Sequence, residues 1–122
     1  MIKPRQLFRS FKHALRGVKV AFKSEQSFRI QIIAALIVAL FMLILPVSAF
    51  EAILLIFMIG SVLVLELINS IFERLVDAFK PRIHPVVGEI KDLMAAAVLI
   101  ASVFAALVGL IVFVPKILEL VA

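Results

Sequence analysis

The hydrophobic and polar positions of the chain form one amphipathic stretch followed by three long apolar runs. Across residues 5–23, basic and apolar side chains recur every three or four positions, so they occupy opposite faces of a helix. Residues 30–50 carry no charge and are long enough to cross a bilayer as a helix. The pattern therefore predicts a membrane-surface helix at 5–28 and a first transmembrane helix at 30–45.

The second apolar run begins after a short turn at Pro46. Ser48 is a suitable N-cap, and Glu51, three residues later, completes a capping box. The run then gains acidic side chains and continues past the length that a bilayer requires. We therefore expect a second transmembrane helix, with a cytoplasmic extension, at 49–79.

A loop and a third apolar run complete the chain, which we treat as a single domain spanning 1–122. Residues 80–88 contain two prolines and a glycine and so predict a loop. Residues 93–114 carry no charge and are followed by Pro115, which predicts a third transmembrane helix at 89–114. Small residues recur every four positions along this helix and predict a helix-packing surface: Ala97, Ala101, Ala105 and Gly109.

The composition is that of an all-α integral membrane protein. Of the 122 residues, 65% are hydrophobic, and the mean hydropathy is +1.24, far above an ordinary soluble domain. The absence of cysteine excludes disulfides, thiolate metal sites and cysteine nucleophiles. The two histidines lie far apart in the sequence without ligand spacing, which argues against a zinc site.

The net charge of +5 is concentrated near the N-terminus, where eight of the 13 Lys and Arg residues lie in the first 29 positions. Basic side chains on an amphipathic helix are typical of contact with anionic lipid headgroups. We therefore expect a membrane surface as the partner and no nucleic acid. By the positive-inside rule, the surface helix and the loop are cytoplasmic, and the C-terminus lies outside.

The second apolar run ends in a stripe of polar side chains spaced by three, four and four residues: Glu66, Asn69, Glu73 and Asp77. At about 100° per residue, these side chains share one helix face. Fourteen uncharged residues separate Glu51 from Glu66 and carry the helix about 21 Å into a hydrocarbon layer about 30 Å thick. A carboxylate at that depth indicates a functional site, although hydrogen bonds to neighbouring helices would also explain Glu66 and Asn69.

These acids, together with Lys91 and Asp92, provide the parts of a phosphoryl-transfer site. Mg²⁺ is commonly held by one or two carboxylates plus substrate phosphates, and a lysine can neutralise phosphate charge. A deeper carboxylate such as Glu66 can accept the proton of a lipid hydroxyl. The sequence contains no GxxxxGK[ST] motif and no Gly-rich kinase loop, which excludes the common nucleotide-binding folds.

Five short motifs lie along nearly the whole chain: Arg16-Gly17-x-Lys19, Glu25-x-x-Phe28-Arg29, Glu66-x-x-Asn69-Ser70-x-x-Glu73-x-x-x-Asp77, His84-Pro85 and Lys91-Asp92-x-x-Ala95-Ala96-Ala97. Their combination resembles the small bacterial integral-membrane diacylglycerol kinase family, which includes undecaprenol kinases. The resemblance implies a homotrimer of three-span subunits in the bacterial cytoplasmic membrane. It also implies active sites at subunit contacts near the cytoplasmic interface.

The resemblance further implies a role for each matching residue in the transfer of the ATP γ-phosphoryl group to a lipid hydroxyl. Glu66 would be the catalytic base, while Glu25 and Glu73 would hold the Mg²⁺ that bridges the ATP phosphates. Phe28 and Ala95 would face the lipid. A larger set would bind the nucleotide: Arg16, Asn69, Glu73, Asp77, His84, Lys91 and Asp92. Spacing alone does not show that Glu25 joins the other acids.

Two questions stay open at the level of sequence. Nothing in the spans separates diacylglycerol from a polyprenol such as undecaprenol as the acceptor lipid. The competing class is a non-enzymatic membrane protein, a transport or assembly subunit that uses Glu66 as an intramembrane polar site. Transport predicts polar residues in more than one span, whereas here the acids cluster at one interface. The pattern therefore favours the kinase.

Overall fold

The computed structural model describes residues 1–79 and 85–122, and these residues form four helices and no strand. The helices are α1 (Pro4–Ser24), α2 (Gln26–Ile44), α3 (Ala49–Ala78) and α4 (Pro85–Val121). By length and composition, α2, α3 and α4 can each cross a membrane. This confirms the expected all-helical architecture with three candidate membrane spans.

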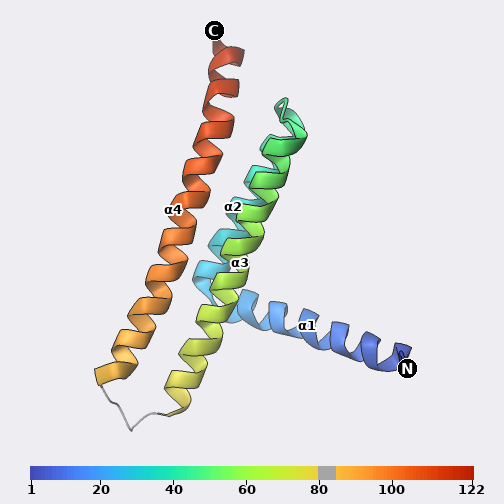
Figure 1. Ribbon diagram of the computed structural model, residues 1–122, viewed down its shortest axis with the longest axis vertical. Helices are drawn as coiled ribbons and strands as arrows, with labels where there is room; N and C mark the ends of the chain where they lie inside the picture. The colour runs from blue at the N-terminus through green and yellow to red at the C-terminus, as the bar shows by residue number, and fades with distance from the viewer. Residues whose placement is uncertain (80–84) are drawn as a thin grey trace.

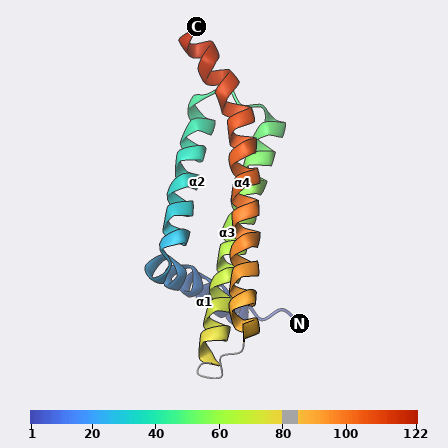
Figure 2. The ribbon, with the colours of Figure 1, turned by 90° about the vertical axis from the view of Figure 1, so that its left-hand side faces the viewer.

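Helices α2, α3 and α4 stand side by side, and α1 extends sideways from one end of them (Figures 1 and 2). We call this end the foot of the bundle; the last turn of α3 and the first turn of α4 also lie there. The turn between α2 and α3 and the C-terminus lie at the opposite end, which we call the far end. Residues distant in the sequence therefore meet at the same level of the bundle.

Helix α1 lies apart from the rest of the bundle. Pro4 presets φ at its first position, and the helix ends at Ser24 because Glu25 is extended, with φ −112° and ψ 110°. On its apolar face, Phe8 and Phe11 are 72% and 64% exposed. An amphipathic helix whose apolar face is left uncovered by its own chain is suited to the membrane interface.

A capping box and an ion pair hold the far end together. Glu51 N–H donates to Ser48 Oγ at 3.1 Å and Ser48 N–H donates to Glu51 Oε1 at 3.0 Å, which confirms the predicted capping box. Glu51 Oε2 also pairs with Lys116 Nζ at 2.9 Å and so links α3 to α4. The main buried apolar cluster lies at this end: Leu45, Leu55, Val112 and Phe113.

Helix α4 does not end at Pro115, where its apolar run is interrupted, but continues to Val121. A proline removes one N–H donor from the helix and bends its axis. Figure 2 shows the last turns of α4 leaning away from the axis of the preceding ones. The ion pair of Lys116 with Glu51 directly follows the proline and ties the bent segment to α3.

Candidate active site

Glu66 is the buried centre of the polar region. Its side chain leaves α3 in the half of the helix nearer the foot, and the residue is 3% exposed. Gln31 Nε2, on α2, donates a hydrogen bond to Glu66 Oε2 at 3.0 Å. Burying a carboxylate among apolar helices is costly unless donors reach it. The Gln31 amide therefore offsets part of the cost of keeping Glu66 out of water.

The sequence motifs do not assign Gln31 to the site, yet its side chain is in direct contact with Glu66. The sequence does contain a sign of its importance, because Gln31 is the one amide residue in the uncharged run 30–50. A lone amide in an apolar span needs a hydrogen-bond partner on a neighbouring helix. In this fold, that partner is the predicted base.

The remaining members of the polar stripe are paired near the foot. Asn69 Nδ2 donates to Glu73 Oε1 at 3.2 Å, one helical turn away. Lys91 Nζ on α4 pairs with Asp77 Oδ1 at 2.7 Å and joins the two helices. The charge of Glu73 also acts on Glu66. The stripe thus forms one connected polar surface that reaches α4.

Glu25 reaches this surface through the break between α1 and α2. Arg74 Nη1 on α3 pairs with Glu25 Oε1 at 3.3 Å, and Arg74 Nη2 donates to Ser24 Oγ at 2.8 Å. The negative charge of Glu25 acts on Glu66 as well. The fold therefore brings Glu25 to the acids of α3, which the spacing of the sequence alone does not show.

Three buried polar atoms around Glu66 have no hydrogen-bond partner among the described residues: Gln31 Oε1, Asn69 Oδ1 and Ser70 Oγ. Buried polar atoms in proteins are nearly always hydrogen-bonded, so each such atom calls for an explanation. A substrate hydroxyl can donate to the amide oxygen of Gln31 or to that of Asn69. The arrangement is therefore suited to receive a polar group beside the buried carboxylate.

Other predicted residues lie outside this cluster. Of the two residues predicted to face the lipid, Phe28 is 2% exposed within one chain and Ala95 is exposed on α4. Asp92 is exposed next to Lys91. Arg16 lies nine residues before Glu25 on the projecting α1, roughly 13 Å along the helix, so one chain does not bring it to the acids. The predicted His84 lies outside the described residues.

Glu25 and Glu73 are the carboxylates that the family motifs assign to a metal ion, and each has another side chain as its partner: Arg74 for Glu25 and Asn69 for Glu73. Within residues 1–79 and 85–122, no three His, Asp or Glu side chains gather to hold a metal ion by themselves. Mg²⁺ does not require such a cage, because it is usually bound by one or two carboxylates together with substrate phosphates. Two carboxylates are therefore a sufficient number of protein ligands for a metal ion that arrives with a nucleotide.

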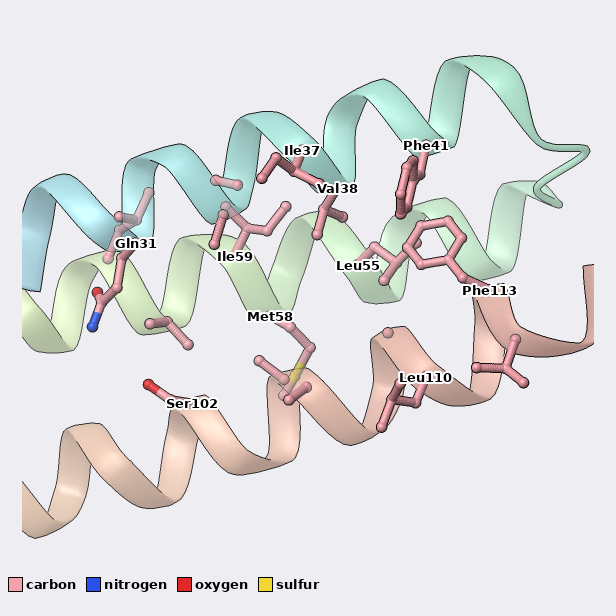
Figure 3. A pocket seen from close by; sticks show the side chains of 18 of the residues that line it. Gln31, Ile37, Val38, Phe41, Leu55, Met58, Ile59, Ser102, Leu110 and Phe113 are labelled. Carbon is pink, nitrogen blue, oxygen red and sulfur yellow. The ribbon is translucent and has the colours of Figure 1, made fainter. Parts of the chain in front are cut away.

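An apolar groove of about 490 Å³ extends from Gln31 between α2, α3 and α4. Figure 3 shows Gln31 and Ser102 at one end and the rings of Phe41 and Phe113 toward the other. These rings meet edge to face, with centroids 5.6 Å apart. Phe41 lies ten positions after Gln31, so the groove runs roughly 15 Å along α2, about half the thickness of a bilayer's hydrocarbon core.

Part of the small-residue stripe of α4 lines the groove within one chain. Ala105 and Gly109, from the stripe of small residues predicted to pack helices, line the groove. A Cβ atom placed on Gly109 would meet no atom within 4 Å. Within one chain, this part of the stripe therefore leaves space between helices instead of bringing them into contact.

Known proteins resemble the chain over most of its length. The family model described as prokaryotic diacylglycerol kinase matches residues 12–113. Undecaprenol kinase of Bacillus subtilis is 32% identical over 111 residues, which cover 91% of this chain and 90% of that protein. Diacylglycerol kinase of Haemophilus influenzae is 38% identical over 95 residues (78% and 80%), and that of Escherichia coli strain K12 is 33% identical over 93 residues (76% and 76%).

Three candidate membrane spans and these matches make the chain an ATP-dependent lipid kinase of bacterial membranes. It belongs to the prokaryotic diacylglycerol kinase family. The resemblance carried by the sequence motifs is thus confirmed. A transport or assembly role is no longer needed to explain a carboxylate within a span.

Replacing Gln31 with leucine should destabilise the protein, because Glu66 would stay buried without its amide donor. Leaving a buried charged group unsatisfied costs about 1–3 kcal/mol or more. Thermal unfolding in detergent micelles measures the loss. The matched control is Gln26→Leu, at an exposed position in the first turn of α2. Equal stability of the two variants would contradict the importance of the Gln31–Glu66 contact.

Proposed function

We propose that the protein transfers the γ-phosphoryl group of MgATP to the hydroxyl of a lipid in the cytoplasmic leaflet, with Glu66 as the general base. The observation that carries this proposal is the position of Glu66. Its carboxylate is buried where the apolar groove meets the acids of the foot, and Gln31 touches both. A lipid hydroxyl and a water-soluble nucleotide can meet at such a boundary.

In the proposed reaction, Glu66 accepts the proton of the lipid hydroxyl while the hydroxyl oxygen attacks the γ-phosphorus. The bond from the γ-phosphorus to the bridging oxygen breaks, and ADP leaves with that oxygen. Glu25 and Glu73 would hold Mg²⁺, which neutralises charge on the phosphates when bound. Gln31 keeps the Glu66 carboxylate in place through the hydrogen bond to Oε2.

The remaining motif residues bind the nucleotide in this proposal. Lys91 and Asn69 contact its phosphates, and Asp77 and Asp92 help to hold the rest of the nucleotide. Lys91 lies within 2.7 Å of Asp77 and Asn69 within 3.2 Å of Glu73, which supports a common binding surface at the foot. Arg16 and His84 belong to the same proposed set through the family motifs.

The acceptor we propose is a polyprenol of the undecaprenol type, with diacylglycerol as the second candidate. One apolar groove about 15 Å long can receive one chain, and a polyprenol alcohol has a single chain. A diacylglycerol would leave its second chain outside the groove. In support, the match with the relative named undecaprenol kinase covers 91% of this chain and 90% of that relative.

We also propose a homotrimer in the bacterial cytoplasmic membrane, with the foot and the N-terminus in the cytoplasm and the C-terminus outside. Many large apolar side chains of the spans are uncovered in one chain, such as Leu43 and Ile111 at 85% and 73% exposed. Lipid and neighbouring subunits would cover them. The basic face of α1 would bind anionic headgroups beside the foot.

Glu66→Gln should abolish transfer but leave nucleotide binding largely intact, because the amide cannot accept the hydroxyl proton. Glu73→Gln should instead weaken binding of MgATP. The measurement is transfer of labelled γ-phosphate to undecaprenol and to diacylglycerol in parallel, in detergent–lipid micelles, together with nucleotide binding. Full activity of both variants, or label on neither lipid from a well-folded wild-type protein, would overturn the proposed function.

Gly109→Leu should raise the KM for the lipid by partly filling the groove. A Cβ at this position meets no atom within 4 Å, and Gly109 lines the groove, so the leucine side chain would occupy groove space. Nucleotide binding should stay as in the wild type. Gly60→Leu is the matched control, because Gly60 is equally open but lies outside the groove lining. Lipid KM values that are the same for both variants would show that the groove does not hold the acceptor.

A further inference from the structure

Arg74 connects α3 to the junction between α1 and α2, and the proposed reaction assigns it no task. Its guanidinium donates to Ser24 Oγ at 2.8 Å and pairs with Glu25 Oε1 at 3.3 Å. A weaker contact of 3.5 Å to the carbonyl oxygen of Ser70 directs the side chain along its own helix. One side chain thus bridges the helix that carries Glu66 and the segment that carries Glu25.

The junction has a conformation that leaves Glu25 dependent on this contact. Glu25 occupies the N-cap position of α2, but its side chain caps no backbone N–H of that helix. Among the described residues, its carboxylate bonds to Arg74 through Oε1 alone. Arg29 closes the end of α1 by donating to the carbonyl oxygens of Phe22 and Lys23 at 2.9 Å each. Arg29 therefore fixes α1 against α2, and Arg74 fixes the junction against α3.

Arg74 places a positive charge beside a group of acidic side chains. Glu25 and Glu73 both act electrostatically on the buried Glu66, and like charges brought together repel one another. Without a bound cation, this repulsion disfavours the position of the Glu25 carboxylate, and the side chain makes no capping bond that would hold it. Arg74 supplies the opposing positive charge. Its contact with Glu25 is longer than the 2.7–2.9 Å typical of strong charge-assisted bonds. Arg74 therefore orients the Glu25 carboxylate but leaves it able to bind a metal ion as well.

We propose that Arg74 is a positioning residue, which holds Glu25 at the acids of α3 so that the carboxylate is in place before the metal–nucleotide complex arrives. This inference rests on the proposed role of Glu25 in binding Mg²⁺ with ATP. An arginine suits the task because its planar fork can reach Ser24 and Glu25 together, whereas a lysine is a single point charge.

The test is the Mg²⁺ concentration that gives half-maximal binding of a non-hydrolysable ATP analogue to the full-length protein in lipid–detergent micelles. Arg74→Met should raise this concentration by about tenfold, equivalent to losing one charge-assisted contact. Arg74→Lys and Ser24→Ala should each give a smaller rise, since each keeps one of the two contacts. The KM for the lipid should remain that of the wild type in all three variants.

Lys23→Met is the matched control, because it removes a neighbouring positive charge whose side chain forms no ion pair in the described residues. Its Mg²⁺ dependence should equal that of the wild type. An unchanged Mg²⁺ dependence in Arg74→Met, or the same shift in Lys23→Met, would overturn the proposal. If Arg74→Met does not fold, the same measurement on Arg74→Lys and Ser24→Ala decides: an unchanged Mg²⁺ dependence in both variants would overturn the proposal. A wild-type protein that binds the analogue equally well without Mg²⁺ would instead contradict the proposed metal role of Glu25 itself.

Discussion

A carboxylate buried between apolar helices needs partners, and in this protein that requirement falls on Glu66. Its cost is offset in part by the Gln31 amide, which reaches it from the neighbouring helix. The contact requires α2 and α3 to lie in a fixed register, with Gln31 and Glu66 at the same level. That register also determines where the groove begins, because Gln31 is both the partner of Glu66 and part of the groove lining.

The polar groups around Glu66 divide into two sides. Toward the far end lies an apolar groove, and toward the foot each acid has a partner: Glu25 with Arg74, Glu73 with Asn69 and Asp77 with Lys91. The two ion pairs among these contacts, of Glu25 and of Asp77, are partly exposed and contribute little to stability. The partners are better explained by their effect on position. They keep the acids at the level of the bundle where a nucleotide would meet a lipid hydroxyl.

Much of the fold is local and could therefore be predicted from the sequence. The apolar runs define the helices, Ser48 and Glu51 form the expected capping box, and residues three or four positions apart share a face, as the bond between Asn69 and Glu73 shows.

Contacts between helices could not be predicted in the same way, because they depend on how each helix is rotated and shifted against its neighbours. The hydrogen bond from Gln31 to Glu66, the bridge made by Arg74 and the burial of Phe28 all belong to this class. The open space beside Gly109 also depends on how the helices are placed against one another.

The central claim is that Glu66 is buried in an apolar setting and meets the acceptor lipid there. A hydrophobic carbodiimide, which reacts with carboxyl groups shielded from water, tests this claim directly when the modified residues are located by mass spectrometry. The account predicts that Glu66 is modified ahead of Glu25 and Glu73, and that added acceptor lipid protects it. Modification of Glu25 and Glu73 without Glu66, or no protection by either undecaprenol or diacylglycerol, would contradict the account.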